Sequence, residues 1–155
     1  MKLGLGCLLA VALVVAGCGS HRKAAPTPPP TRADFVRRAS AVCRTYYAKF
    51  NRLAQPRTLA EIGPYIDKAS ALIEAELRQL HRVEAPPALA VRYRTFLATG
   101  TKELALTRRL SKAAKAGDAA SVRRLIANGQ RIDAHANALA KAMGLRVCAQ
   151  TPSTG

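Results

Sequence analysis

The sequence predicts an all-α protein, an up-down-up-down four-helix bundle closed by a disulfide between the first helix and the C-terminus. Apolar residues recur every three or four positions in four successive stretches, which is the spacing of buried helical faces. Hydrophobic residues make up 49% of the chain and aromatic residues only 5%, so the core must be built mainly from Ala, Leu, Val and Ile. Short connections with proline, glycine and capping residues separate the stretches, as expected between antiparallel helices.

The first residues have the pattern of an export signal. Met1-Lys2 supplies a positive charge, and Leu3 to Val15 form an apolar stretch too short to span a membrane. The segment Val15-Ala16-Gly17-Cys18 resembles the lipobox of bacterial lipoproteins. That resemblance implies that residues 1–17 are a signal peptide and that Cys18 becomes a lipidated N-terminus carrying acyl chains such as palmitate. The alternative is an ordinary secretory cleavage in which Cys18 plays no part.

Residues 18–30 are predicted to form a tether between the lipid and the folded part. The segment GSHRKAAPTPPP has no apolar periodicity, and its prolines favour an extended chain of about 3.1 Å per residue. We therefore expect an exported protein held by its lipid on the outer face of the cytoplasmic membrane. The bundle is predicted to occupy residues 31–148, and residues 149–155 are predicted to be a disordered tail.

Helix one is predicted to begin at Thr31, which forms the pattern of a capping box with Asp34. Gln55-Pro56 is predicted to end it, because a residue before proline avoids the helical conformation. The predicted buried face consists of Phe35, Ala39, Val42, Tyr46, Phe50 and Leu53.

Helix two is predicted to begin at Thr58, where Glu61 completes a second capping-box pattern, and to end near Val83. Pro64 removes one backbone donor, so we expect either a kink or a later start near Gly63. The predicted buried face consists of Ile62, Ile66, Ala69, Ile73, Leu77 and Leu80.

Helix three is predicted to follow Pro86-Pro87 and to end at Gly117. Asp118 is placed to cap helix four, and Gly144 can take the left-handed conformation that ends a helix, with Leu145 folding back. The predicted faces are Tyr93, Phe96, Leu97, Gly100, Leu104, Thr107 and Leu110 in helix three, and Val122, Leu125, Ile126, Gly129, Ile132, Ala136, Leu139 and Met143 in helix four.

Two of the four cysteines are predicted to form a disulfide. Cys7 lies in the apolar leader and Cys18 in the lipobox, which leaves Cys43 and Cys148 as a pair in an exported chain. If helices one and four are antiparallel neighbours, Leu145 to Cys148 can extend about 13 Å. That length matches the roughly 15 Å from the start of helix one to Cys43. Two separate buried thiols are the alternative.

The sequence contains no motif for catalysis or metal binding. It lacks the Glu-x-x-His pattern of di-iron bundles, a Cys-x-x-Cys-His haem attachment and a phosphate-binding glycine loop. His81 lies near Glu84 and His135 near Asp133, but both pairs are placed more easily toward solvent than toward each other. We therefore expect no enzymatic activity, no metal site and no cofactor.

Two glycines, Gly100 and Gly129, lie within predicted buried helical faces, where glycine costs about 1 kcal/mol relative to alanine. Close helix packing is one explanation, and a slot for a small apolar ligand between the helices is the other. Tyrosines at helical spacing are expected to lie in the core with their hydroxyls at its edge, where they would also suit the rim of a slot. These tyrosines are Tyr46, Tyr47, Tyr65 and Tyr93.

The chain is strongly basic, with 25 Lys and Arg against 9 Asp and Glu and a formal net charge of +16. The predicted topology gathers cations at the end of the bundle away from the tether, while the other end mixes both signs. Arg123 and Arg124 lie early in helix four, where the helix dipole does not favour cations. We predict a basic distal tip, which binds an anionic partner and consists of Arg52, Arg57, Arg108, Arg109, Lys112, Arg123 and Arg124. The acids assigned to the other end are Asp34, Glu74, Glu76, Glu84 and Asp133. A solvated basic face without a partner, or an arginine-rich composition from a high-GC genome, is the alternative.

The lipobox, the proline-rich spacer, Cys43 within helix one and the final Gly144 to Cys148 segment together resemble small exported helical proteins of high-GC Gram-positive bacteria. The resemblance implies no activity for the bundle. The sequence therefore predicts a monomeric, membrane-tethered and non-enzymatic binding module of the cell envelope. Its expected partner is an anionic envelope polymer, a lipid headgroup or an acidic protein, and no specific nucleic acid is expected. A carrier of a small apolar ligand within the bundle is the alternative.

Overall fold

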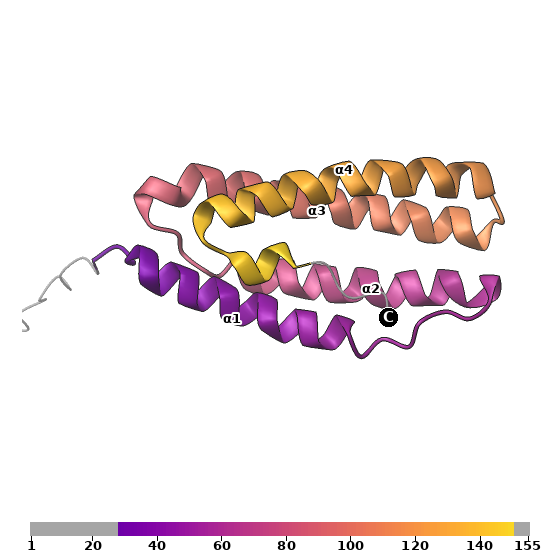
Figure 1. The fold of residues 1–155 in the computed structure, drawn as a ribbon, viewed down its shortest axis with the longest axis horizontal. Coiled ribbons are helices and arrows are strands. Elements are labelled where there is room, and N and C mark those ends of the chain that lie inside the picture. The colour runs from indigo at the N-terminus through magenta and orange to yellow at the C-terminus, as the bar shows by residue number, and fades with distance from the viewer. Residues whose placement is uncertain (1–27, 151–155) are drawn as a thin grey trace, which may run out of the picture.

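The computed structural model describes residues 28–150, so the predicted signal peptide, Cys18 and most of the predicted tether lie outside the described residues. The described chain forms α1 (Arg32–Phe50), α2 (Leu59–Leu80), α3 (Pro87–Lys115), α4 (Ala119–Met143) and the short 3₁₀ helix η1 (Arg146–Ala149). Successive helices run in opposite directions (Figure 1), which confirms the predicted four-helix bundle. Within this part of the chain there is no strand, and no helix is both long enough and apolar enough to cross a membrane.

The first and last helices meet mainly through η1. Helix α1 packs on α2 and η1, whereas α4 packs on α3 and η1, and α3 has its largest contacts with α2 and α4. Figure 1 shows η1, at the yellow end of the ribbon, turning back from α4 into the space beside α1. The predicted antiparallel arrangement of α1 and α4 is confirmed, with the difference that η1 supplies most of the contact between them.

The predicted Cys43–Cys148 disulfide is present, and its Cα atoms are 5.1 Å apart. The segment leading to it differs from the prediction, because it forms the compact turn of η1 instead of an extended strand. A short turn is enough because the end of α4 lies beside α1. A Cβ placed on Gly144 would lie 3.6 Å from Cγ2 of Val36 in α1. Val36 precedes Cys43 by seven residues, about 10 Å along the helix. The end of α4 therefore lies closer to Cys43 than the sequence argument assumed.

Three predicted helix ends are confirmed. The Thr31 hydroxyl accepts the backbone N–H of Asp34 at 3.1 Å, and the Asp118 carboxylate accepts that of Ser121 at 2.9 Å. Each bond satisfies a backbone donor that the first turn of a helix leaves free. Gly144 ends α4 with a φ of 87°, in the left-handed region.

The predicted start of α2 at Thr58 is confirmed, since Thr58 is the N-cap and the helix begins at Leu59, but the predicted capping box is not formed. The Thr58 hydroxyl makes no capping hydrogen bond, and the Glu61 carboxylate instead accepts the N–H of Arg57 at 2.7 Å. The helix already includes Pro64, so the predicted later start near Gly63 is wrong. A proline so close to a helix start interrupts few backbone hydrogen bonds, which explains why the helix tolerates it.

Helix α1 ends at Phe50, earlier than the predicted Gln55-Pro56. The N–H groups of Arg52 and Leu53 donate to carbonyls three residues earlier, so the chain tightens into turns after Asn51. Asparagine is a poor helix former, and the apolar spacing up to Leu53 did not reveal this change. In Figure 1 the connection after α1 continues along the bundle to the far end, where α2 begins.

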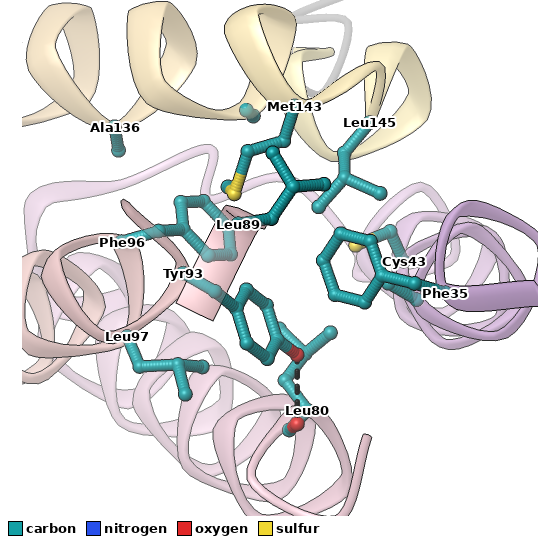
Figure 2. Close-up of a cluster of buried hydrophobic side chains, with 12 residues drawn as sticks. Phe35, Cys43, Leu80, Leu89, Tyr93, Phe96, Leu97, Ala136, Met143 and Leu145 are labelled. Atoms are coloured by element: carbon teal, nitrogen blue, oxygen red, sulfur yellow. Dashed lines mark hydrogen bonds between the residues drawn. The ribbon is translucent and has the colours of Figure 1, made fainter. Parts of the chain in front are cut away.

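The most buried part of the core lies where α1, the end of α4 and the start of α3 meet (Figure 2). The rings of Phe35 and Tyr93 pack edge to face with centroids 4.8 Å apart. Met143 and Leu145 are fully buried beside them. The Tyr93 hydroxyl donates to the carbonyl oxygen of Leu80 at 2.7 Å, so this buried polar group is satisfied.

Gly144→Ala is expected to destabilise the protein by about 1 to 2 kcal/mol, because an alanine is strained at a left-handed φ. Gly129→Ala is the matched control, since its new Cβ would meet Cδ2 of Leu106 at an ordinary 3.5 Å within a helix. That control should gain about 0.5 to 1 kcal/mol from helix propensity. Urea denaturation of the full-length chain measures both changes. Equal effects of the two substitutions would contradict this account of the α4 terminus.

Candidate ligand-binding cavity

A cavity of about 200 Å³ lies in the middle of the bundle, where all four helices and the η1 segment approach one another. Most of its wall is apolar, and three carboxylic acids face it. It is lined by Cys43, Tyr47, Phe50, Ile73, Glu76, Leu77, Leu80, Phe96, Gly100, Glu103, Asp133, Ala136, Asn137, Val147, Cys148 and Gln150.

Helical spacing explains how the acids reach the cavity. Glu76 lies three residues after Ile73 and four before Leu80, on the same face of α2. On α3, Glu103 follows Gly100 by three residues, which again places both on one face. These glutamates therefore occupy positions that the helical pattern would otherwise give to core residues.

Burial raises the pKa values of all three acids, and a neighbouring acid adds to the effect on two of them. Burial raises the pKa of Glu76 to about 7, with a further contribution from the charge of Glu103. Burial likewise raises the pKa of Glu103 to about 7, and the charge of Asp133 adds to the effect. Burial also raises the pKa of Asp133. Neither hydrogen bonds nor cations among residues 28–150 offset these effects on Glu76 and Glu103.

The structure corrects the sequence assignment of two of these acids. Glu76 and Asp133 were assigned to the mixed-charge end of the bundle, but both line the cavity at mid-length. The third acid, Glu103, was not singled out from the sequence. The signal that marks Glu76 and Glu103 is their spacing from neighbouring core residues, which the search for charge clusters did not use.

The two mid-helix glycines have different surroundings. Gly100 lines the cavity, and a Cβ placed on it would lie only 2.7 Å from Cδ2 of Leu77. Both explanations given for Gly100, close helix packing and space beside a slot, therefore agree with its surroundings. Gly129 lies away from the cavity. Among the four tyrosines, only Tyr47 lines the cavity wall.

The predicted distal tip is less uniform than the sequence suggested. Its seven cations are all exposed, but Arg108 lies well inside α3 and pairs with Glu74 at 2.6 Å. Glu74 also pairs with Arg78 at 3.1 Å, so it belongs to the middle of α2 and not to a separate end. Arg52 follows the early end of α1, short of the far end. The cations without an ion pair among residues 28–150 include Arg109, Lys112 and Arg123.

A polar contact joins α2 to α3 near the far end. The Asp67 carboxylate accepts hydrogen bonds from the Ser111 hydroxyl and the Lys115 ammonium, each at 2.5 Å. Gly63 makes room for this contact, since a Cβ there would lie 2.7 Å from Cγ of Lys115. These hydrogen bonds lower the pKa of Asp67. The Lys115 side chain therefore has a structural role, since it links α3 to α2.

The two histidines of the bundle are exposed and lie apart from the cavity. Asp133 faces the cavity, whereas His135 lines a separate groove between α3 and α4 beside Lys102 and Arg131. The sequence neighbours His135 and Asp133 thus face different surfaces. Across residues 28–150, no group of three or more His, Cys, Asp and Glu side chains is arranged to hold a metal ion.

Comparisons with models of known protein families, with curated proteins and with solved structures found no match to this chain. The function must therefore be argued from the cavity and from the distribution of charge.

Glu103→Gln is expected to stabilise the protein at high pH and to change its stability little at low pH. Folding raises the pKa of Glu103 from 4.5 to about 7, so ionisation opposes the folded state. The stability contributed by the neutral acid is present below about pH 4.5 and is lost as the pH rises through about 7. Such a shift corresponds to roughly 3 kcal/mol, so a gain of about 2 to 3 kcal/mol is expected near pH 8.

Urea denaturation at about pH 5 and about pH 8 checks this pH dependence. Glu84→Gln is the matched control, because it removes the same charge from an exposed position. If both variants gain the same stability at both pH values, the gain arises from overall charge and not from burial of Glu103.

Proposed function

We propose that the protein is a membrane-tethered, non-enzymatic binding protein of the cell envelope, and that its cavity holds a small amphiphilic ligand. The observation that supports this proposal is the presence of two partly buried glutamates, Glu76 and Glu103, on an otherwise mostly apolar wall that includes no Lys or Arg from residues 28–150. The ligand in this proposal has an apolar body and one cationic or hydrogen-bond-donating group.

Burying a carboxylic acid in a mostly apolar cavity costs free energy. Removing a carboxylate from water is unfavourable unless a partner compensates for it, and perturbed pKa values concentrate at functional sites for that reason. The chain carries 25 Lys and Arg residues, so a neutralising cation was readily available in composition. None of the ion pairs among residues 28–150 involves Glu76 or Glu103. A ligand cation would supply the missing compensation.

The size of the cavity limits the ligand. An engineered cavity of about 150 Å³ accommodates benzene, so about 200 Å³ suits a ligand with on the order of eight to ten non-hydrogen atoms. A ring or short chain would contact Phe96, Leu77 and the disulfide, while its polar group reached the acids. This proposal takes up the alternative function predicted from the sequence, a carrier, and replaces its purely apolar ligand by an amphiphilic one.

The basic surface supports a second candidate function, binding to an anionic envelope polymer, headgroup or acidic protein. Arg109 and Lys112 near the end of α3 and Arg123 near the start of α4 are exposed and form no ion pair among residues 28–150. They share the far end of the bundle, where the turn between these two helices lies. These three residues, here named the basic end, are members of the predicted tip that form no ion pair among residues 28–150.

The membrane tether in this proposal is the lipid on Cys18. Each buried methylene contributes about 0.8 kcal/mol, so two acyl chains anchor a protein stably without help from the bundle. A disulfide is typical of exported proteins, and the Cys43–Cys148 bond is compatible with that location. The charge of the bundle is then free for a role other than membrane retention.

Benzylammonium is expected to bind in the cavity more tightly than benzyl alcohol, and benzoate is expected not to bind there. All three probes fit the available volume, and they differ in the charge that they present to Glu76 and Glu103. NMR titration of the full-length chain measures affinity and maps the contacts. The double variant Glu76→Gln/Glu103→Gln should weaken benzylammonium binding at least tenfold, which corresponds to about 1.4 kcal/mol.

The order of the three affinities separates binding in the cavity from binding to the surface. Because the chain is highly positive, surface binding would favour benzoate over benzylammonium. Unchanged affinity in the double variant, or chemical-shift changes confined to the surface, would rule out the proposed ligand class.

Substitution of the basic end by Arg109→Ser/Lys112→Ser/Arg123→Ser is expected to weaken binding to anionic phospholipid vesicles at least tenfold at about 0.15 M salt. Each cation near such a surface contributes about 1 kcal/mol. Both proteins should carry Cys18→Ser, so that no lipid contributes to binding. The control is Arg82→Ser/Arg92→Ser/Arg94→Ser, which removes the same charge from other exposed positions. An equal loss in both triple variants would show that only net charge matters.

A further inference from the structure

Three of the cavity-lining residues belong to the C-terminal segment that follows α4. Val147 and Cys148 lie in η1 and Gln150 follows it, while Cys43 lines the cavity from α1. The Cys43–Cys148 disulfide therefore joins two walls of the cavity. In Figure 1 the η1 segment lies across the space between α1 and α4.

The segment is attached weakly apart from this bond. Leu145, just before η1, is fully buried, but η1 itself contains no buried residue. Its backbone N–H groups donate within its own turn, from Cys148 to the carbonyl of Leu145 at 3.0 Å and from Gln150 to that of Val147 at 3.2 Å. No backbone hydrogen bond ties η1 to α1 or α2. Partly buried contacts and the disulfide hold it in place.

We propose that η1 is a cover over the cavity, with Leu145 as its anchor, and that the Cys43–Cys148 disulfide locks the cover in the closed position. This inference rests on the proposed function and adds a means of regulating ligand exchange at the same site. A dithiol reductant, such as a thiol-disulfide oxidoreductase, opens the lock.

The reductant attacks one of the two sulfur atoms in preference to the other. Cys43 is 2% exposed, whereas Cys148 is half-buried, so the incoming thiolate attacks Sγ of Cys148. The bond between the two cysteines breaks, and Cys43 leaves as a thiolate that takes up a proton. The second thiol of the reductant then attacks the mixed disulfide and releases Cys148. Two electrons and two protons pass to the protein, and the reductant becomes a disulfide.

Opening the cover exposes the cavity without dismantling the rest of the bundle. Helix α3 retains its contacts with α2 and α4, which do not involve η1. The hydrogen bond from Tyr93 to Leu80 also lies outside the segment that moves. The mouth of the cavity then widens on the side that η1 lines, and a ligand enters or leaves past this wider opening.

Amide hydrogen exchange on the full-length chain tests the cover. The chain should carry Cys7→Ser and Cys18→Ser so that only the disulfide responds, and it is compared with and without dithiothreitol. Reduction is expected to remove nearly all protection from residues 146–150, while residues 93–106 of α3 stay protected because the bundle remains folded. The dissociation rate of benzylammonium, measured by NMR, is expected to rise at least tenfold in the same sample.

Met143→Ala with the disulfide intact is the control for general destabilisation, because Met143 is fully buried but lies outside η1. It should loosen the core without a selective effect on residues 146–150. The proposal is overturned if reduction leaves exchange in η1 unchanged, or if residues 93–106 lose their protection together with η1, as they would for a bond that only holds the whole bundle together. Absence of benzylammonium binding in both redox states would instead refute the proposed function, and the exchange measurement on η1 would still decide whether the cover exists.

Discussion

The covalent bond between Cys43 and Cys148 fixes one of the two contacts that position α1 in the bundle. Helix α1 packs on α2 and on η1, and the bond fixes that second contact. Closing a loop of 105 residues is worth about 4 to 5 kcal/mol in the chain-entropy description. For a domain of this size, that is a large part of the usual net stability. The same bond keeps η1 between the first and last helices, and the cavity lies beneath it.

The cavity and the surface of the bundle carry charges of opposite sign. The chain carries a large excess of cations, whereas the cavity is faced by three acids that form no ion pair with any cation among residues 28–150. Small residues, Gly100 and Ala136, leave room beside Glu103, and larger apolar side chains complete the wall. The cavity therefore disfavours anions, whereas the basic surface attracts them. Two kinds of partner, a small cationic ligand and an anionic polymer or surface, are therefore separated in space.

Structural features that depend on residues close together in the chain could be predicted from the sequence. The caps at Thr31, Asp118 and Gly144 depend on local backbone geometry, and apolar spacing identified all four helices. The disulfide followed from export and topology together. The predicted end of α1 was wrong because the proline signal at Pro56 was given more weight than local helix propensity. The start of α2 at Thr58 was predicted correctly, but its capping box is not formed.

The cavity was beyond sequence reasoning because it depends on how distant elements meet. The sequence predicted the return of the chain after Gly144 and gave a slot beside Gly100 as one alternative, but no local pattern placed Cys148 and Glu103 around one space. Glu76 carried a usable signal in its spacing from Ile73 and Leu80, but a charged residue on an apolar face can also lie at the boundary with solvent. Whether Glu76 and Glu103 lie inside depends on the neighbouring helix, which only the fold supplies.

Native mass spectrometry of the oxidised full-length protein, purified without denaturant from its own host, tests the central claim most directly. The account predicts a one-to-one complex with a small molecule that carries an amine or another cationic group. It further predicts that the molecule is absent from the Glu76→Gln/Glu103→Gln variant purified in the same way. Detection of the unliganded mass alone in both proteins, or of the same bound molecule in both, would contradict the account.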